Sequence, residues 1–181
     1  MSSHKVPPKA WKPFLDSVDR TLTEAVELHC FGGFVVTQMY GLARTTSDID
    51  FISLVPNHWR RQLVEIAGKG SDLHRTYGLY LDPVTVVTPP EDYETRLTPM
   101  YDGVWTRLRL LALEAHDVAL TELERNFARD RTDIQQLAAA GLLQASLLRT
   151  RYQHELRPFL ARAEWHDATL QLWLESYFPP D

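Results

Sequence analysis

Apolar residues in the first two thirds of the chain recur at two spacings, which predict helices and short strands. The positions Trp11, Phe14, Leu15, Val18 and Leu22 follow the i, i+3, i+4, i+7 stripe of an amphipathic helix. Shorter apolar runs, bounded by Gly, Pro and polar residues, predict the elements that follow. In chain order these are a strand at 25–31, a helix at 34–40, a strand at 49–55, a helix at 58–69, a strand at 76–81, a β-like run at 84–87, a polar loop or short helix at 91–103 and a strand at 104–112.

The pattern changes after Glu114, where the strand signal ends and only helical spacing remains. Helices are predicted at 116–127, 131–140, 143–155 and 166–177. We therefore expect an α+β fold, with a mixed sheet of about four to five strands flanked by helices and a helical C-terminal part. We assign residues 11–113 to the core and residues 114–181 to a helical extension packed on that core.

Composition and charge narrow the class of protein. With 181 residues, the chain fits one domain, or one domain with a helical extension. A net charge of −5 does not favour non-specific binding to nucleic acid. The single cysteine, Cys30, excludes an intramolecular disulfide, and no apolar run reaches the ~20 residues of a membrane span. We expect a cytoplasmic protein with no membrane partner.

The stretch from Cys30 to Leu54 carries the candidate chemistry. Gly32 and Gly33 follow a predicted strand and precede a predicted helix, so backbone N–H groups there can face a phosphate. Asp48 and Asp50 lie two residues apart on the next strand, which places both carboxylates on one face. Two such carboxylates repel each other unless a proton or a cation lies between them, and Mg²⁺ (or Mn²⁺) prefers oxygen ligands. Asp-x-Asp alone is a weak pattern, but together with the glycines it indicates a nucleoside triphosphate site.

The segment FGGFVVTQMYGLARTTSDIDFIS resembles the signature of the DNA polymerase β-like nucleotidyltransferase superfamily. Its Arg-x-Thr-x-Asp-Ile-Asp form resembles small bacterial nucleotidyltransferase-like proteins of the DUF6036 type, which are related to abortive-infection toxins. The segments LRLLALEAHDVALTELERNFARDRTDIQQLAAAGLL and RYQHELRPFLAR resemble the C-terminal part of that group. The resemblance covers residues 20–177 and implies a minimal nucleotidyltransferase fold.

The resemblance also implies roles for individual residues around the glycine pair. Gly32 and Gly33 match the positions that contact the triphosphate of the substrate. Arg44 and Ser47, which lie close to the carboxylates in sequence, match positions that contact phosphate or ribose. These four residues form the expected nucleotide-binding set.

Three aspartates form the expected catalytic set. By the same resemblance, Asp48 and Asp50 hold the metal. The superfamily needs a third carboxylate on a neighbouring strand, either as the base for the attacking hydroxyl or as a ligand of a second metal. Asp82 is the candidate for that role, and the alternative is a turn residue in front of Pro83.

One departure from the family pattern leaves the activity open. Relatives usually carry a lysine where this chain has Glu122, although Arg125, Arg129 and Arg131 follow closely and could supply the cation. The first hypothesis is an enzyme, in one form toxin-like with an antitoxin partner, that transfers a nucleoside monophosphate from an NTP to a hydroxyl of RNA or protein. The second is a degenerate, non-catalytic member that binds nucleotide or a partner protein. The third is a nucleic-acid-binding module.

Overall fold

The computed structural model describes residues 6–178, and the chain divides into two compact units. The first, here called the sheet unit, comprises Met1–Thr85 and Leu97–Ala112. The second, the helical unit, comprises Val86–Arg96 and Leu113–Asp181. The segment Val86–Arg96 therefore groups with the C-terminal residues, although it lies between two parts of the sheet unit in the sequence. The predicted packing of an extension on a core stays a prediction.

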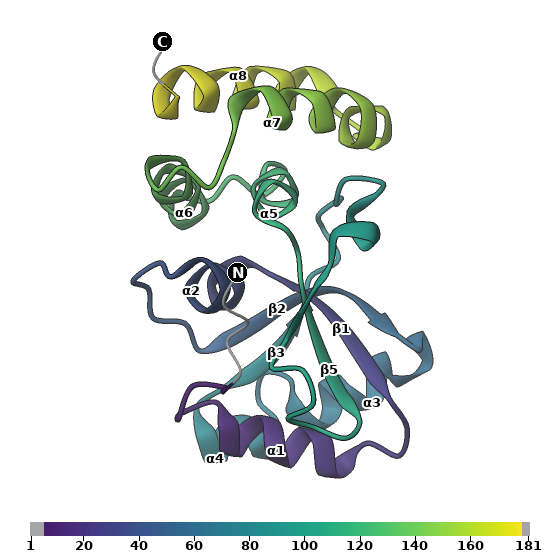
Figure 1. Ribbon diagram of the computed structural model, residues 1–181. Coiled ribbons are helices and arrows are strands. Elements are labelled where there is room, and N and C mark those ends of the chain that lie inside the picture. The colour runs from purple at the N-terminus through teal and green to yellow at the C-terminus, as the bar shows by residue number, and fades with distance from the viewer. Residues whose placement is uncertain (1–5, 179–181) are drawn as a thin grey trace. The chain divides into compact units, whose positions relative to one another are not determined.

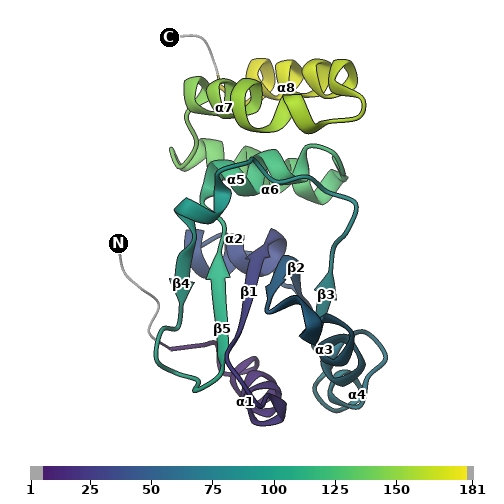
Figure 2. The same ribbon diagram turned by 90° about the vertical axis from the view of Figure 1, so that its right-hand side faces the viewer.

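Among the described residues, five strands form one mixed sheet in the order β3-β2-β1-β5-β4 (Figures 1 and 2). Strand β1 pairs antiparallel with β2 and parallel with β5, β2 pairs parallel with β3, and β4 pairs antiparallel with β5. The predicted α+β fold with a mixed, helix-flanked sheet is confirmed. The strands are β1 (Val26–Phe31), β2 (Asp48–Val55), β3 (Tyr80–Pro83), β4 (Thr98–Met100) and β5 (Leu108–Ala112).

The helices α1, α2 and α3 of the sheet unit form where the sequence predicts them, and α4 was not predicted. The apolar stripe of α1 (Lys12–Thr21) buries Phe14, Leu15 and Val18 completely, as its helical spacing predicts. Figures 1 and 2 show α1 and α4 together below the strands, and α2 beside the end of β1 from which it continues. The remaining helices are α2 (Gly32–Tyr40), the 3₁₀ turn η1 (Asn57–Trp59), α3 (Arg60–Ala67) and α4 (Asp72–Tyr77).

The strand predicted at 76–81 is wrong over its first four residues, because residues 72–77 form α4 and β3 begins at Tyr80. Ser71 caps α4 by accepting a hydrogen bond from the backbone N–H of His74 at 3.1 Å. Gly78 ends the helix in the left-handed conformation, with φ 69°. A cap and a terminating glycine thus override the β-like composition of the short segment.

Two further differences from the predicted elements follow β3 in the sequence. The β-like run at 84–87 forms no strand. Within the predicted loop or short helix at 91–103, Tyr93–Arg96 form the 3₁₀ turn η2 and Thr98–Met100 form the edge strand β4. The edge strand β4 has only three residues and contains Pro99, which argues against a strand when the sequence is considered alone.

The helical unit contains four α-helices among its described residues, close to the four predicted. In Figures 1 and 2, α7 and α8 lie side by side, as α5 and α6 also do. Pro158 lies in the 3₁₀ turn that separates the last helix from the one before it, as expected. The elements are α5 (Ala115–Glu122), α6 (Ala128–Ala139), α7 (Ala145–Arg151), the π-helical turn η3 (Tyr152–Leu156), the 3₁₀ turn η4 (Arg157–Phe159) and α8 (Ala163–Tyr177).

A buried network of charges ties these helices to the segment Val86–Arg96. The carboxylate of Asp117 on α5 is fully buried and accepts hydrogen bonds from Arg96 at 2.8 and 3.0 Å and from Arg151 at 2.9 Å. Arg96 also donates to Glu155 at 2.6 Å, and Arg151 donates to Glu114. The buried Asp117 and the half-buried Glu114 and Glu155 therefore each face a guanidinium group, the arrangement that makes burial of charge tolerable.

A candidate metal centre beside the first turn of α2

Three aspartates of the sheet unit meet at the start of β2. In the parallel pairing of β2 with β3, Asp50 lies opposite Asp82 and Asp48 lies opposite Tyr80. One carboxylate oxygen from each of Asp48, Asp50 and Asp82 lies within 4.8 Å of one from the other two. Asp50 is only 6% exposed, and Asp48 and Asp82 are half-buried. Three hard oxygen donors at this spacing match the ligand preference of Mg²⁺ or Mn²⁺.

Two hydroxyl groups hold the carboxylate of Asp48. Thr46 Oγ1 donates to Oδ1 of Asp48 at 2.6 Å, and the phenol of Tyr80 donates to Oδ2 at 3.1 Å. Burial, and then the negative charges of Asp48, Asp82 and Asp50 together with the Asp48 hydrogen bond, raise the pKa of Tyr80 to about 12. At neutral pH the phenol is therefore protonated and acts as a donor.

Gly32, the first residue of α2, is required by its surroundings in two ways. Its backbone is left-handed, with φ 69°, a conformation that residues with a Cβ rarely adopt. A Cβ at this position would also lie 2.5 Å from Oδ2 of Asp50. Only glycine lets the helix begin directly against the buried carboxylate of the candidate centre.

Gly33 in the same way makes room for the side chain of Arg44. A Cβ at Gly33 would lie 2.8 Å from Cζ of Arg44, so the guanidinium group of Arg44 rests on the first turn of α2. The hydroxyl of Thr37 lies 3.4 Å from the backbone carbonyl of Arg44 and connects this loop to the helix. The first N–H groups of a helix and a guanidinium group are both donors to anions, and here they lie together.

Ser47 is placed beside the centre by the backbone. Its carbonyl accepts a hydrogen bond from the N–H of Tyr80 at 3.0 Å, which extends the pairing of β2 and β3 by one residue. Its side chain is exposed, and the predicted contact with phosphate or ribose stays a prediction. The structure thus gathers the predicted residues Gly32, Gly33, Arg44, Ser47, Asp48, Asp50 and Asp82 in one region of the sheet unit.

Sequence analysis missed Thr46 and Tyr80. Tyr80 lies two residues before Asp82 on β3, just as Asp48 lies two residues before Asp50 on β2. The repeated spacing on two strands is a usable signal, but only once the parallel register of β2 and β3 is known. Thr46 lies two residues before Asp48, and a hydroxyl residue at that distance commonly bonds a nearby polar group.

Glu122, where the resemblance implies a lysine, is the last residue of α5 in the helical unit and is fully buried. Arg125 Nη2 lies 3.9 Å from its Oε1, and the same arginine donates to both oxygens of Asp130 at 3.1 and 3.2 Å. Asp130 in turn accepts from the backbone N–H of Phe127 and so caps the start of α6. Arg125 is therefore engaged by acids of its own unit.

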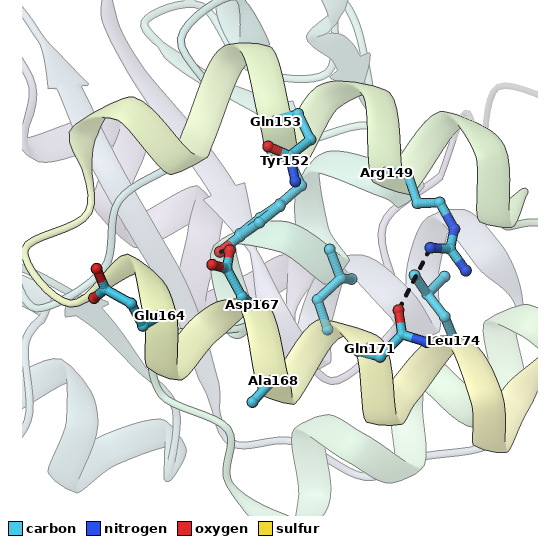
Figure 3. Close-up of a pocket in the computed structure, with 9 residues that line it drawn as sticks. Arg149, Tyr152, Gln153, Glu164, Asp167, Ala168, Gln171 and Leu174 are labelled. Carbon is cyan, nitrogen blue, oxygen red and sulfur yellow. Dashed lines mark hydrogen bonds between the residues drawn. The ribbon is translucent and has the colours of Figure 1, made fainter.

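A separate hollow of about 460 Å³ lies in the helical unit, between α7 with its π-helical turn and α8 (Figure 3). Tyr152 donates to Asp167 at 2.6 Å across it, and Arg149 contacts Gln171 at 3.4 Å. None of the residues predicted for the nucleotide or metal site lines this hollow.

In residues 6–178, every helix is too short or too polar to cross a membrane.

A mixed sheet that presents Asp-x-Asp beside a Gly-Gly helix start, with a third aspartate on the adjoining strand, defines a nucleotidyltransferase-like protein. The family model DUF6036, described as a nucleotidyltransferase of unknown function, matches residues 15–175. The chain belongs to this family, which confirms the resemblance found in its sequence and carries with it the expectation of an NTP substrate. No curated protein and no solved structure matches the chain.

Proposed function

We propose that this protein is a metal-dependent nucleotidyltransferase, which transfers a nucleoside monophosphate from an NTP to a hydroxyl group of RNA or of a protein. The observation that carries the proposal is the convergence of Asp48, Asp50 and Asp82 within 4.8 Å of one another in a chain of a nucleotidyltransferase family. Catalytic sites commonly bring groups of like charge close together in this way.

The donor chemistry of the centre fits a divalent cation. Asp48 and Asp50 would hold Mg²⁺ or Mn²⁺ through carboxylate oxygens, and Gly32 supports this set because no larger residue fits against Asp50. When bound, such an ion supplies positive charge that stabilises the triphosphate and the charge that develops as the transfer proceeds.

The first turn of α2 is suited to hold the triphosphate. The backbone N–H groups of Gly32 and Gly33 have no helical partner, and the positive end of the helix dipole favours an anion. Arg44 adds a guanidinium group beside Gly33, and Ser47 adds a hydroxyl beside Asp48. Together these groups bind and orient the phosphates without needing to contact the base.

In the proposed reaction, the acceptor hydroxyl attacks the α-phosphorus of the NTP in line with the bond to the β-phosphate. Asp82 takes the proton of the hydroxyl, a new oxygen–phosphorus bond forms, and the bond between the α-phosphorus and the bridging oxygen breaks. Pyrophosphate leaves with that oxygen, and Arg44 compensates part of its charge. The position of Asp82 opposite Asp50, beside the carboxylates that would hold the metal, supports a role as base.

Substitution of one carboxylate tests the proposal. Asp48→Asn should abolish the Mg²⁺-dependent transfer of label from α-³²P-labelled NTPs to total cellular RNA or protein. The control is Asp72→Asn, an equally conservative change of a 93%-exposed aspartate in the same unit, which should label as the wild type does. Equal labelling by the wild type and by Asp48→Asn would overturn the assignment.

A non-catalytic role is the alternative, and Glu122 favours it, because a buried carboxylate stands where the resemblance implies a lysine. Calorimetry with NTP and Mg²⁺ separates the two functions. Binding that depends on Asp48 without any transfer would indicate a nucleotide-binding member, whereas no such binding would indicate a partner-binding module.

In the toxin-like form of the enzyme, expression of the wild type, but not of Asp48→Asn, should arrest growth, and an antitoxin partner should relieve the arrest.

A further inference from the structure

The carboxylate of Asp48 is held on both sides by neutral donors that have no assigned role. Thr46 Oγ1 binds one oxygen at 2.6 Å and Tyr80 binds the other at 3.1 Å. The two donors come from different segments, the loop before β2 and the strand β3, so the fold brings them to the same carboxylate.

Such a pair of hydrogen bonds fixes what is otherwise a soft degree of freedom. The terminal torsion of an aspartate has a broad distribution, so a lone carboxylate can present its oxygens at many angles. Each carboxylate oxygen has about two lone-pair sites, and one hydroxyl donor on each leaves the other site for a metal. The bonds from Thr46 and Tyr80 therefore select the plane in which Asp48 can act as a ligand.

The phenol of Tyr80 is itself fixed in place. Its backbone N–H donates to the carbonyl of Ser47, its ring lies edge-on to that of His74 at 5.0 Å, and the ammonium group of Lys69 lies 5.8 Å from the ring centre. A donor held this firmly loses little conformational freedom when it binds Asp48, so its orientation is available to the carboxylate before any ligand arrives.

We propose that Tyr80 and Thr46 are positioning residues, which orient Asp48 for a divalent cation and favour Mg²⁺ over the larger Ca²⁺. This inference rests on the proposed metal-dependent function. Mg²⁺ requires near-ideal octahedral geometry, whereas Ca²⁺ accepts six to eight ligands at flexible angles. A freely rotating Asp48 should therefore weaken Mg²⁺ binding much more than Ca²⁺ binding.

The test measures binding of each metal alone to the full, metal-free chain by calorimetry. Tyr80→Phe and Thr46→Val each remove one hydroxyl, and each should weaken Mg²⁺ binding by about 10- to 100-fold, with a clearly smaller loss for Ca²⁺. Thr46→Ser restores the donor and should bind Mg²⁺ nearly as the wild type does. The control is Tyr77→Phe, which removes a hydroxyl of the same unit that bonds Ser17 instead, and which should leave both affinities unchanged.

The outcomes separate this inference from the proposed function. If Asp48→Asn binds both metals as the wild type does, the metal-dependent function itself is wrong. If Asp48→Asn loses metal while Tyr80→Phe and Thr46→Val retain wild-type affinities, or lose Mg²⁺ and Ca²⁺ equally, the positioning role is wrong. Should Tyr80→Phe fail to fold by circular dichroism, the difference between Thr46→Val and Thr46→Ser decides the result.

Discussion

Asp48 in the sheet unit and Asp117 in the helical unit are both aspartates with several hydrogen bonds, but their partners differ in kind. Asp117 is fully buried and accepts all its side-chain bonds from the guanidinium groups of Arg96 and Arg151. Asp48 is half-buried, accepts from the hydroxyls of Thr46 and Tyr80, and lies near two further carboxylates.

The partners indicate what each carboxylate does. An arginine that forms two bonds to a buried acid cancels its charge and fixes the packing of the elements that carry the pair. A hydroxyl orients an acid and leaves its charge in place, which suits a carboxylate that must bind a cation. On this ground we assign Asp117 to the fold of the helical unit and propose that Asp48 serves the chemistry of the sheet unit.

The largest expected effect comes from the isosteric change Asp117→Asn. Arg96 and Arg151 keep their bonds to Glu155 and Glu114, but the fully buried carboxylate that they share becomes a neutral amide, so the free energy of unfolding should fall by about 3 kcal/mol. Urea unfolding measures the loss, and amide hydrogen exchange in α5 locates it.

Asp48→Asn is the matched variant for that prediction. Its amide oxygen can still accept from a hydroxyl, and the site is half-buried, so the free energy of unfolding should change by less than about 1 kcal/mol. The comparison fails if Asp48→Asn destabilises the protein as much as Asp117→Asn does, because both acids would then be structural.

A smaller effect separates the glycine that begins α2 from the glycine that follows it, which have nearly equal φ angles. Gly32 and Gly41 have φ values of 69° and 74°, so Ala at either position should cost roughly 1–2 kcal/mol for the left-handed backbone. Only at Gly32 does the new Cβ meet an atom of the centre, Oδ2 of Asp50, whereas nothing lies within 4 Å at Gly41.

Gly32→Ala should therefore lose Mg²⁺ binding and nucleotide transfer in addition to stability, while Gly41→Ala loses stability alone. Thermal melts and metal calorimetry on the two variants check this difference. Equal metal binding by both variants would mean that the contact between Gly32 and Asp50 does not shape the centre.

The sequence predicts much of the sheet unit because its elements carry strong local signals. The stripe of α1, the apolar runs of β1 and β2, and Gly41 at the end of α2 all appear where their patterns predict them. Short elements carry weaker signals. The cap at Ser71 and the glycine at position 78 make residues 72–77 a helix, and local composition does not reveal that the two act together.

Local sequence patterns predict only some residues of the candidate centre. Asp48 and Asp50 are linked by spacing within one strand, so the period of a strand suffices to place them on one face. Asp82 joins them through the parallel pairing of β2 with β3, and only its resemblance to a family pattern points to it in the sequence. The bonds of Arg96 to Asp117 and of Tyr80 to Asp48 join residues 21 and 32 positions apart, respectively, and no periodicity predicts such pairs.

The smallest expected effect is a dependence on pH that belongs to the helical unit. The ordinary pKa of a glutamate is 4.5, and burial alone would raise that of Glu114. The hydrogen bonds and charges of His116 and Arg151 outweigh burial and lower the pKa to about 2. A depressed pKa means that the folded state holds the proton more weakly than the unfolded state. The resulting stabilisation is complete above pH 4.5 and is lost as the pH falls towards 2.

Since a third of the Glu114 side chain is exposed, water screens its ion pairs, and the loss should be on the order of 1 kcal/mol. Glu114→Gln should remove this part of the pH dependence, as measured by urea unfolding at steps between pH 6 and pH 3. Glu24 in the sheet unit gives the contrast, because hydrogen bonds from Trp59 and His58 also lower its pKa, but at an exposed site. Glu24→Gln should therefore change the pH profile less than Glu114→Gln does, and the reverse order would show that the paired acids of the helical unit do not contribute to its stability as inferred from Asp117.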